Sequence, residues 1–458
     1  MHRLKVLAGA LTLALLLVAG AAFAVDTGTA DFSRYVAFGD SLTAGFSSGS
    51  LVRTYQVNSY PALIYRQATG QSTGFEQPLI SEPGIPPVLV LRSLSPLSIT
   101  PSQGQGQPIN LNLPRPYNNI AVPGADVHDL LATTQGGLHD VVLRRQGFTQ
   151  LQQGLSLQPT FVTLWIGNND ALAAATSGIV NDQTLTPEAQ FAAEYRMVTA
   201  AIASTGAKMA IANIPDVTSI PFVTTISRFI VNPQTNQPVL GPTGQPIPLI
   251  GPNGPLQAGD FVLLSATAEL ALGRGIPAQL GGSGQPLSDS VVLSANEAAT
   301  IRARVQAFNN IIASEANARG AAFVDFNAAL SDVNAHGYNV GGITYTTAFL
   351  TGGFVSYDGV HPTAFGYAYI ANLFIDAINE KFGGEIPLVD LYPFVFGTST
   401  AAVTAAATAP LGGDKAAGEY TDFVFTQEAR RSLLLSLGVP KWVVDGTKPP
   451  RHRRGGKG

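Results

Sequence analysis

RYVAFGDSLT, at residues 34–43, is the stretch of sequence that decides the fold. Its first six residues are mostly apolar and include aromatic and β-branched types, which predicts a buried strand ending at Gly39. Ser41 follows at the carboxyl end of that strand, where open parallel sheets hold their ligands. Since a Gly-Asp-Ser-Leu turn also arises by chance, the role of Ser41 depends on what the rest of the chain places beside it.

Four more short apolar segments alternate with segments of helical spacing. This alternation is typical of a parallel sheet with helices on both faces. We therefore expect an α/β fold with one doubly wound sheet of five strands. The four further strands are expected at residues 117–122, 161–167, 207–214 and 321–326.

Three of the expected helices carry clear start and stop signals. Thr186 is the expected N-cap of the first, with Pro187 at the first helical position. In the second, Ser294 and Glu297 form a capping box. The third is expected at residues 363–382 and ends at a Gly-Gly pair. Apolar residues at helical spacing in the second and third helices indicate faces that pack on the core.

The domain organisation follows from the breaks in this alternation. One folded domain is expected over residues 31–384, with insertions at about 70–116 and 217–293. The second insertion contains two similar segments with Gly-Pro, which favour a β-turn or a hairpin-like flap. This insertion either shapes a binding site or is a plain surface excursion. Residues 385–458 are expected to be a C-terminal extension with a basic tail, and an anionic cell envelope is one candidate contact for that tail.

The N-terminus has the composition of an export signal. Arg3 and Lys5 precede an apolar run over residues 6–23 that closes with Ala22-Phe23-Ala24. This pattern predicts a signal peptide over residues 1–24, cleaved after Ala24, and a mature protein in the periplasm, on the cell surface or in the medium. A transmembrane anchor is the alternative, for which the run is short.

Composition excludes several classes of chemistry. The formal net charge of -4 gives no attraction to nucleic acid. The chain has no cysteine, which excludes disulfides, a thiol nucleophile and thiolate metal sites. No cofactor or metal is expected. Outside the signal and the tail, the imidazoles available as a base are those of His128, His139, His336 and His361.

Two further sequence blocks could supply hydrogen-bond donors to a reacting oxygen. In NNIAVPGAD (118–126), Gly124 follows a strand, so its amide can approach a substrate or simply serve a tight turn. In IGNND (166–170), the side-chain amide of an asparagine can stabilise an oxyanion. Alternatively, Asn168 and Asn169 can form a turn that precedes a helix. These residues alone leave open whether Asn168 or Asn169 faces the site.

The last block, DGVHP at residues 358–362, could supply a base. Serine becomes nucleophilic when an imidazole takes its proton and a carboxylate orients that imidazole. Asp358 and His361 are three residues apart, and Gly359 gives the loop between them freedom to bring the two side chains together. The alternatives are metal ligation, which no further histidine cluster supports, or a surface histidine before a helix.

Together, in this order and each near a strand end, the four blocks resemble the GDSL-type, or SGNH, hydrolases, a family of esterases and lipases. The resemblance runs from about residue 34 to 382, apart from the insertions. It implies a three-layer α/β/α sandwich with a flavodoxin-like, five-stranded sheet, and no cofactor. It also implies that Ser41, His361 and Asp358 are the catalytic residues. The oxyanion hole it implies consists of the Ser41 amide, the Gly124 amide and the Asn169 side chain.

A second serine motif competes with Ser41. GFSSG at residues 45–49 fits the Gly-x-Ser-x-Gly elbow of α/β-hydrolases, but that motif requires a strand directly before it, so Ser47 is not expected to be the nucleophile. The expected activity is hydrolysis of a lipid or short-chain acyl ester, because the chain is apolar for an exported protein, with a mean hydropathy of +0.20. A polysaccharide acetyl esterase and a non-catalytic envelope-binding protein are the alternatives.

Overall fold

The computed structural model describes residues 24–94, 97–232, 235, 237–396, 435, 439 and 441–445. The predicted signal peptide before Ala24 and the basic tail at 448–458 lie outside these residues, as does most of the predicted C-terminal extension after residue 396. In the described part of the chain, no helix combines the length and the apolar character that a membrane span requires.

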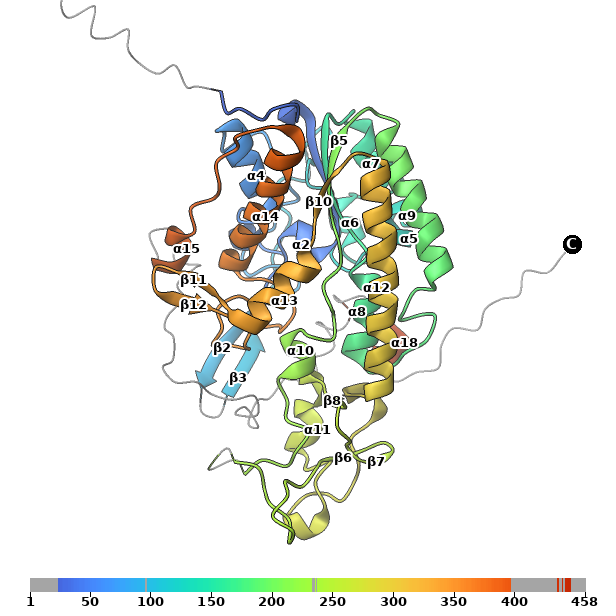
Figure 1. The fold of residues 1–458 in the computed structure, drawn as a ribbon, viewed down its shortest axis with the longest axis vertical. Helices are drawn as coiled ribbons and strands as arrows, with labels where there is room; N and C mark the ends of the chain where they lie inside the picture. Colours follow the sequence, from blue (N-terminus) through green and yellow to red (C-terminus); the bar gives the residue numbers. More distant parts are fainter. Residues whose placement is uncertain are drawn as a thin grey trace, which may run out of the picture.

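A parallel sheet forms the centre of the fold (Figure 1). Its strands lie in the order β1-β4-β5-β10. Tyr35 pairs with Phe161 and Phe161 with Lys208, so the three central strands start in register and their carboxyl ends meet at one edge. The strands are β1 (Tyr35–Gly39), β4 (Phe161–Trp165), β5 (Lys208–Ala212) and β10 (Ala322–Val324).

The expected fifth strand at residues 117–122 is not a strand, so the predicted strand count is corrected from five to four. The segment does run parallel to β1 and forms one β-bridge, between Ala37 and Asn119. Its backbone also exchanges hydrogen bonds with β1 through Asn118, Ile120 and Val122. No second strand lies outside it among the described residues, and at this edge the pairing is too short for a ladder. Its place beside β1 still gives the flavodoxin-like order.

Alternate side chains of the sheet face two helical layers, which confirms the sandwich. Val36 and Phe38 lie in one buried cluster with α5 (Val127–Ala132), α7 (Gln150–Ser156), α8 (Asn169–Ser177), α9 (Glu188–Ala203) and α12 (Ala295–Ala318). Tyr35 and Ala37 lie in a second cluster with α4 (Tyr60–Thr69), α13 (Phe326–His336) and α14 (Ala364–Phe382). Figure 1 shows α4 and α14 on one side of the strands and α9 and α12 on the other.

Helix boundaries agree with the sequence signals, with one exception. The Ser294–Glu297 capping box is present at the start of α12, and Gly383 closes α14 in the left-handed conformation. Thr186, however, is not the N-cap of α9. Pro187 takes that position because its ψ of 136° is extended, and the helix begins one residue later, at Glu188.

The two insertions contain small elements of their own. In the first, β2 (Leu89–Leu94) and β3 (Leu97–Pro101) form an antiparallel hairpin. The second forms a lobe, defined here as residues 221–293, with a separate buried apolar cluster around Val262 and Leu287 (Figure 1). It contains α10 (Pro221–Thr224), α11 (Thr267–Ala271), and the antiparallel pairs β6 (Ile250–Gly251) with β7 (Gly254–Pro255) and β8 (Phe261–Val262) with β9 (Val292–Leu293).

The remaining described elements are short. They are α2 (Ser41–Ala44), α3 (Arg53–Gln56), α6 (His139–Val142), α15 (Tyr392–Phe396), α18 (Lys441–Val444), the pair β11 (Tyr338–Val340) and β12 (Ile343–Tyr345), and four 3-10 turns, η1 (Phe32–Arg34), η2 (Leu264–Ala266), η3 (Ala278–Leu280) and η4 (Asp289–Val291).

Candidate active site

The turn after β1 places Ser41 at the first position of α2. Asp40 is the N-cap, and its carboxylate accepts a hydrogen bond from the Leu42 amide at 3.0 Å. Gly39 is required just before it, because a Cβ there would lie 2.1 Å from Thr43 Oγ1 and 2.4 Å from the Trp165 carbonyl oxygen. The expected serine therefore lies at the carboxyl edge of a central strand.

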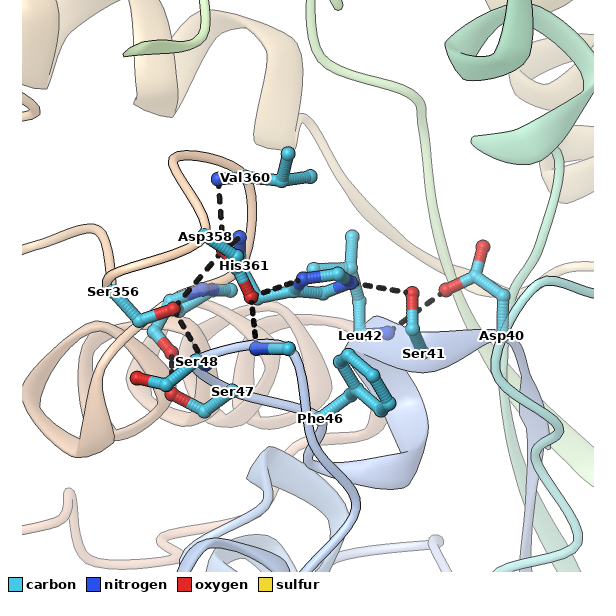
Figure 2. A network of polar contacts seen from close by, with 12 residues as sticks. Asp40, Ser41, Leu42, Phe46, Ser47, Ser48, Ser356, Asp358, Val360 and His361 are labelled. Carbon is cyan, nitrogen blue, oxygen red and sulfur yellow. Dashed lines mark hydrogen bonds and ion pairs between the residues drawn. The ribbon is translucent and has the colours of Figure 1, made fainter. Parts of the chain in front are cut away.

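The loop before α14 brings the expected base to this serine. His361 Nε2 lies 2.9 Å from Ser41 Oγ, and His361 Nδ1 lies 2.9 Å from Asp358 Oδ2 (Figure 2). All three side chains are buried, although Ser41 and His361 are 320 residues apart in sequence. The structure thus assembles the hydroxyl, the imidazole and the carboxylate in the order that proton transfer requires.

Asp358 is held as a carboxylate by the groups around it. Burial on its own would raise its pKa, but the neighbouring His361 and the backbone donors outweigh burial and lower the pKa below the ordinary value. Oδ1 accepts from the amides of Val360 and His361, at 2.9 and 2.8 Å. Since the ionised carboxylate only accepts, Nδ1 of His361 must donate to it, which leaves Nε2 to accept the Ser41 proton.

Two of the three oxyanion groups expected from the sequence, Gly124 and Asn169, lie close together. Asn169 Nδ2 donates to the carbonyl oxygen of Ala125 at 2.8 Å, which ties the asparagine to the residue after Gly124. Gly124 has a φ of 87°, a conformation that suits glycine. The side-chain nitrogen Nδ2 of Asn169 carries a second hydrogen that the bond to Ala125 does not use. Asn169 and Gly124 are thus placed as one unit.

Asn168 has a different partner, which the sequence did not reveal. Its Nδ2 donates to Asp40 Oδ2 at 2.8 Å, so the amide is linked to the residue before the nucleophile. Burial raises the pKa of Asp40 to about 6, and the hydrogen bond from Asn168 partly offsets that rise. No feature of the sequence pattern signals this pair, because its members are 128 residues apart.

A cleft with mostly apolar walls opens beside Ser41 and His361. Asn168 is among its lining residues, while Asn169 is not. Its walls come from the nucleophile turn, α8, the segment that enters the lobe, α13 and the loop before α14; they include Leu42, Leu172, Val217, Ile220, Phe326, Leu330, Phe354, Val355 and Val360. Ser219, Asn334 and Thr347 add polar groups to the lining.

Ser47, the competing serine, is not the hydroxyl that pairs with the imidazole. Its hydroxyl donates to the carbonyl oxygen of Pro362 at 2.9 Å, and the imidazole bonds to Ser41 (Figure 2). Phe46, which the sequence reasoning missed, packs its ring against the imidazole with centroids 4.8 Å apart. GFSSG therefore borders the site without placing Ser47 next to the base.

A family model for GDSL-like lipases and acylhydrolases matches residues 35–374 of the chain. The chain belongs to that family. As a GDSL-like lipase/acylhydrolase, it is a carboxylic ester hydrolase, and the expected family is confirmed. The match spans all four sequence blocks, including both insertions and the loop with Asp358 and His361.

Solved structures that are similar to this chain include an esterase and a lipase. A mutant of an acetylxylan esterase from Geobacillus stearothermophilus is 12% identical, with a TM-score of 0.34, over 76% of this GDSL-like chain and 94% of that one. An extracellular lipase from Streptomyces rimosus is 18% identical, with a TM-score of 0.31, over 76% of this chain and 98% of the lipase. At these scores the likenesses do not bear on the substrate. No curated protein matches the chain.

Proposed function

We propose that this protein is an exported serine esterase that hydrolyses esters of apolar acyl chains, with Ser41 as nucleophile, His361 as base and Asp358 as the carboxylate that orients it. The observation that supports this proposal is the continuous hydrogen-bonded chain from Ser41 through His361 to Asp358, at the mouth of an apolar cleft. A buried imidazole held at both nitrogens needs little rearrangement to accept a proton.

The proposed reaction has two halves. Ser41 Oγ attacks the ester carbonyl while His361 Nε2 takes the hydroxyl proton, and the negative charge on the carbonyl oxygen is stabilised by the amides of Ser41 and Gly124 and by the Asn169 side chain. The tetrahedral intermediate collapses, and His361 gives its proton to the departing alcohol. Water, deprotonated by His361, then attacks the acyl-enzyme and releases the acid and free Ser41.

The cleft favours an apolar acyl group over an acetylated sugar. Its walls are mainly aliphatic and aromatic side chains, and burying a methylene group on such a wall contributes about 0.8 kcal/mol. A polysaccharide site needs many hydrogen-bonding groups, whereas this lining includes few polar side chains beyond Ser41, His361 and Asn168.

Hydrolysis of p-nitrophenyl esters from acetate to palmitate, measured beside acetate release from acetylated xylan, tests the substrate. We expect kcat/KM to rise with acyl length over several methylenes. Ile220→Trp, which fills the cleft wall, should move the optimum to shorter chains. Leu272→Trp, at an exposed position of the lobe, should leave the optimum unchanged. A preference for acetate in the wild type, with acetate released from xylan, would support the acetyl-esterase alternative instead.

Turnover itself is tested with a fluorophosphonate probe, which reacts only with an activated serine. We expect labelling of the native protein, none after heat denaturation and none in Ser41→Ala. Replacing Ser41 should also lower kcat by about 10⁴-fold or more. A native protein that resists the probe and hydrolyses no ester would support the non-catalytic, envelope-binding alternative.

A further inference from the structure

GFSSG, at residues 45–49, matches a nucleophile motif, yet its serine is not the nucleophile of the proposed mechanism. Every residue of this segment from Phe46 to Gly49 contacts the loop that carries Asp358 and His361, or the helix after that loop. The two segments are about 310 residues apart in sequence and lie side by side in the site (Figure 2).

The contacts are specific hydrogen bonds. The Gly49 amide donates to Asp358 Oδ2 at 2.8 Å, which is the oxygen that also accepts from the imidazole. The Ser47 hydroxyl donates to the carbonyl oxygen of Pro362, the residue after the base, at 2.9 Å. From α14, the Tyr367 hydroxyl donates to the Phe46 carbonyl oxygen at 2.6 Å and fixes the segment from its other side.

Ser356 links the segment to the second carboxylate oxygen. Its Oγ accepts from the Ser48 amide at 2.8 Å and donates to Asp358 Oδ1 at 3.1 Å. One hydroxyl therefore bonds both to the GFSSG segment and to the catalytic carboxylate. Ser48 has a φ of 50°, which is uncommon outside glycine and persists only where surrounding contacts hold it. Ser47, Ser48 and Ser356 are all buried, so water does not replace these bonds.

We infer that GFSSG is a positioning element for the proposed base, and that Ser47 and Ser356 are positioning residues that fix the Asp358 carboxylate and the imidazole against Ser41. This inference rests on the proposed function. The segment acts through His361 and Asp358 and touches no substrate in the proposed mechanism. The amides of Ser48 and Gly49, the Ser47 hydroxyl and the Phe46 carbonyl oxygen all bond to the loop that carries Asp358 and His361 or to the helix after it.

Ser47→Ala and Ser356→Ala test the inference, with Ser50→Ala as the matched control. Ser50 is equally buried and adjoins the same segment, but its hydroxyl has no hydrogen-bond partner in the described structure. Losing a hydrogen bond to a charged or backbone group at the site corresponds to about a ten- to hundredfold change in rate. We expect kcat to fall by that factor in the two test variants, with KM within about twofold, and to stay unchanged in Ser50→Ala.

Two further measurements separate positioning from a loss of folding. The downfield proton resonance of His361 Nδ1–H should shift or broaden in Ser356→Ala but not in Ser50→Ala, and Ser356→Thr, which keeps the hydroxyl, should restore most of kcat. Equal kcat and an unchanged resonance in all three alanine variants would overturn the inference. If the wild type itself neither reacts with the fluorophosphonate probe nor hydrolyses an ester, it is the proposed function that fails.

Discussion

At the scale of single residues, the two adjacent asparagines have separate hydrogen-bond partners. Asn168 is bonded to Asp40, whereas Asn169 is bonded beside Gly124. We expect Asn169→Ala to lower kcat by about 100- to 1,000-fold with little change in KM, because an oxyanion donor acts mainly on the transition state. Steady-state kinetics on a chromogenic ester measures this.

Asn168→Ala is the matched comparison. It leaves one oxygen of the buried Asp40 carboxylate without its donor, so we expect a lower melting temperature and a smaller loss of kcat than in Asn169→Ala. The opposite ranking, with kcat lost mainly in Asn168→Ala at an unchanged melting temperature, would reassign the oxyanion role to Asn168, which lines the cleft.

Asp40 gives stability a defined dependence on pH. Its pKa rises from 3.8 to about 6 on folding, so between these values the folded state holds a proton that the unfolded state has lost. Stability therefore falls as pH rises from about 4 to 6, by about 3 kcal/mol from this group, and is flat above that range. Asp358, with a lowered pKa, acts in the opposite sense: its contribution is present above pH 4 and is lost as pH falls through its folded pKa.

Urea unfolding of the wild type and Asp40→Asn between pH 4 and 7.5 checks this prediction. We expect the difference in unfolding free energy between the two proteins to change by about 3 kcal/mol across this pH range, since asparagine does not titrate. Asparagine is also a good N-cap, which limits other losses. Parallel curves over the whole range would show that Asp40 does not titrate there.

At the scale of elements, the lobe meets the catalytic loop at Gly359. The Phe222 amide of α10 donates to the Gly359 carbonyl oxygen at 2.9 Å. Gly359 has a φ of 74°, and a Cβ there would lie 3.1 Å from Phe222 N and 3.2 Å from a methyl carbon of Leu264. A side chain at position 359 would therefore be strained by the left-handed backbone and would be in tight contact with the lobe.

Gly359→Ala should consequently lower both stability and kcat. Gly383 offers a matched control: its φ is 71°, but a Cβ there would meet nothing within 4 Å. We expect both substitutions to cost about 1–2 kcal/mol of unfolding free energy from the left-handed backbone. A loss of kcat is expected in Gly359→Ala alone. Equal kcat values in the two variants would show that the contact with the lobe does not fix the conformation of the loop between Asp358 and His361.

Sequence patterns predicted four of the five expected strands. Strands β1, β4, β5 and β10 have apolar runs long enough to identify, whereas residues 117–122, which include two asparagines, form one β-bridge to β1 and no ladder. Ser41, Asp358, His361, Gly124 and Asn169 were predicted from four short blocks. The bonds of Asp40, Phe46 and Ser356 were not, because each depends on a partner brought close only by the tertiary fold.

At the scale of the whole molecule, the residues that follow the predicted cleavage site are bonded to the end of α14. Asp26 accepts from the Glu385 amide, and the Thr29 amide donates to the Phe382 carbonyl oxygen, so residues from 26 onward are tied to the end of α14. We propose export on the sequence signal and expect the mature chain to start at Val25. N-terminal sequencing of protein recovered outside the cytoplasm tests this, and an intact Met1 on that material would favour the anchor.

The 320-residue separation between Ser41 and His361 has a consequence during synthesis. Under the proposed mechanism, a ribosome-bound chain that exposes Ser41 has no base for its hydroxyl proton until residue 361 has emerged and the sheet has folded. A precursor held unfolded for the proposed export would therefore hydrolyse no ester, whichever esters the mature enzyme accepts.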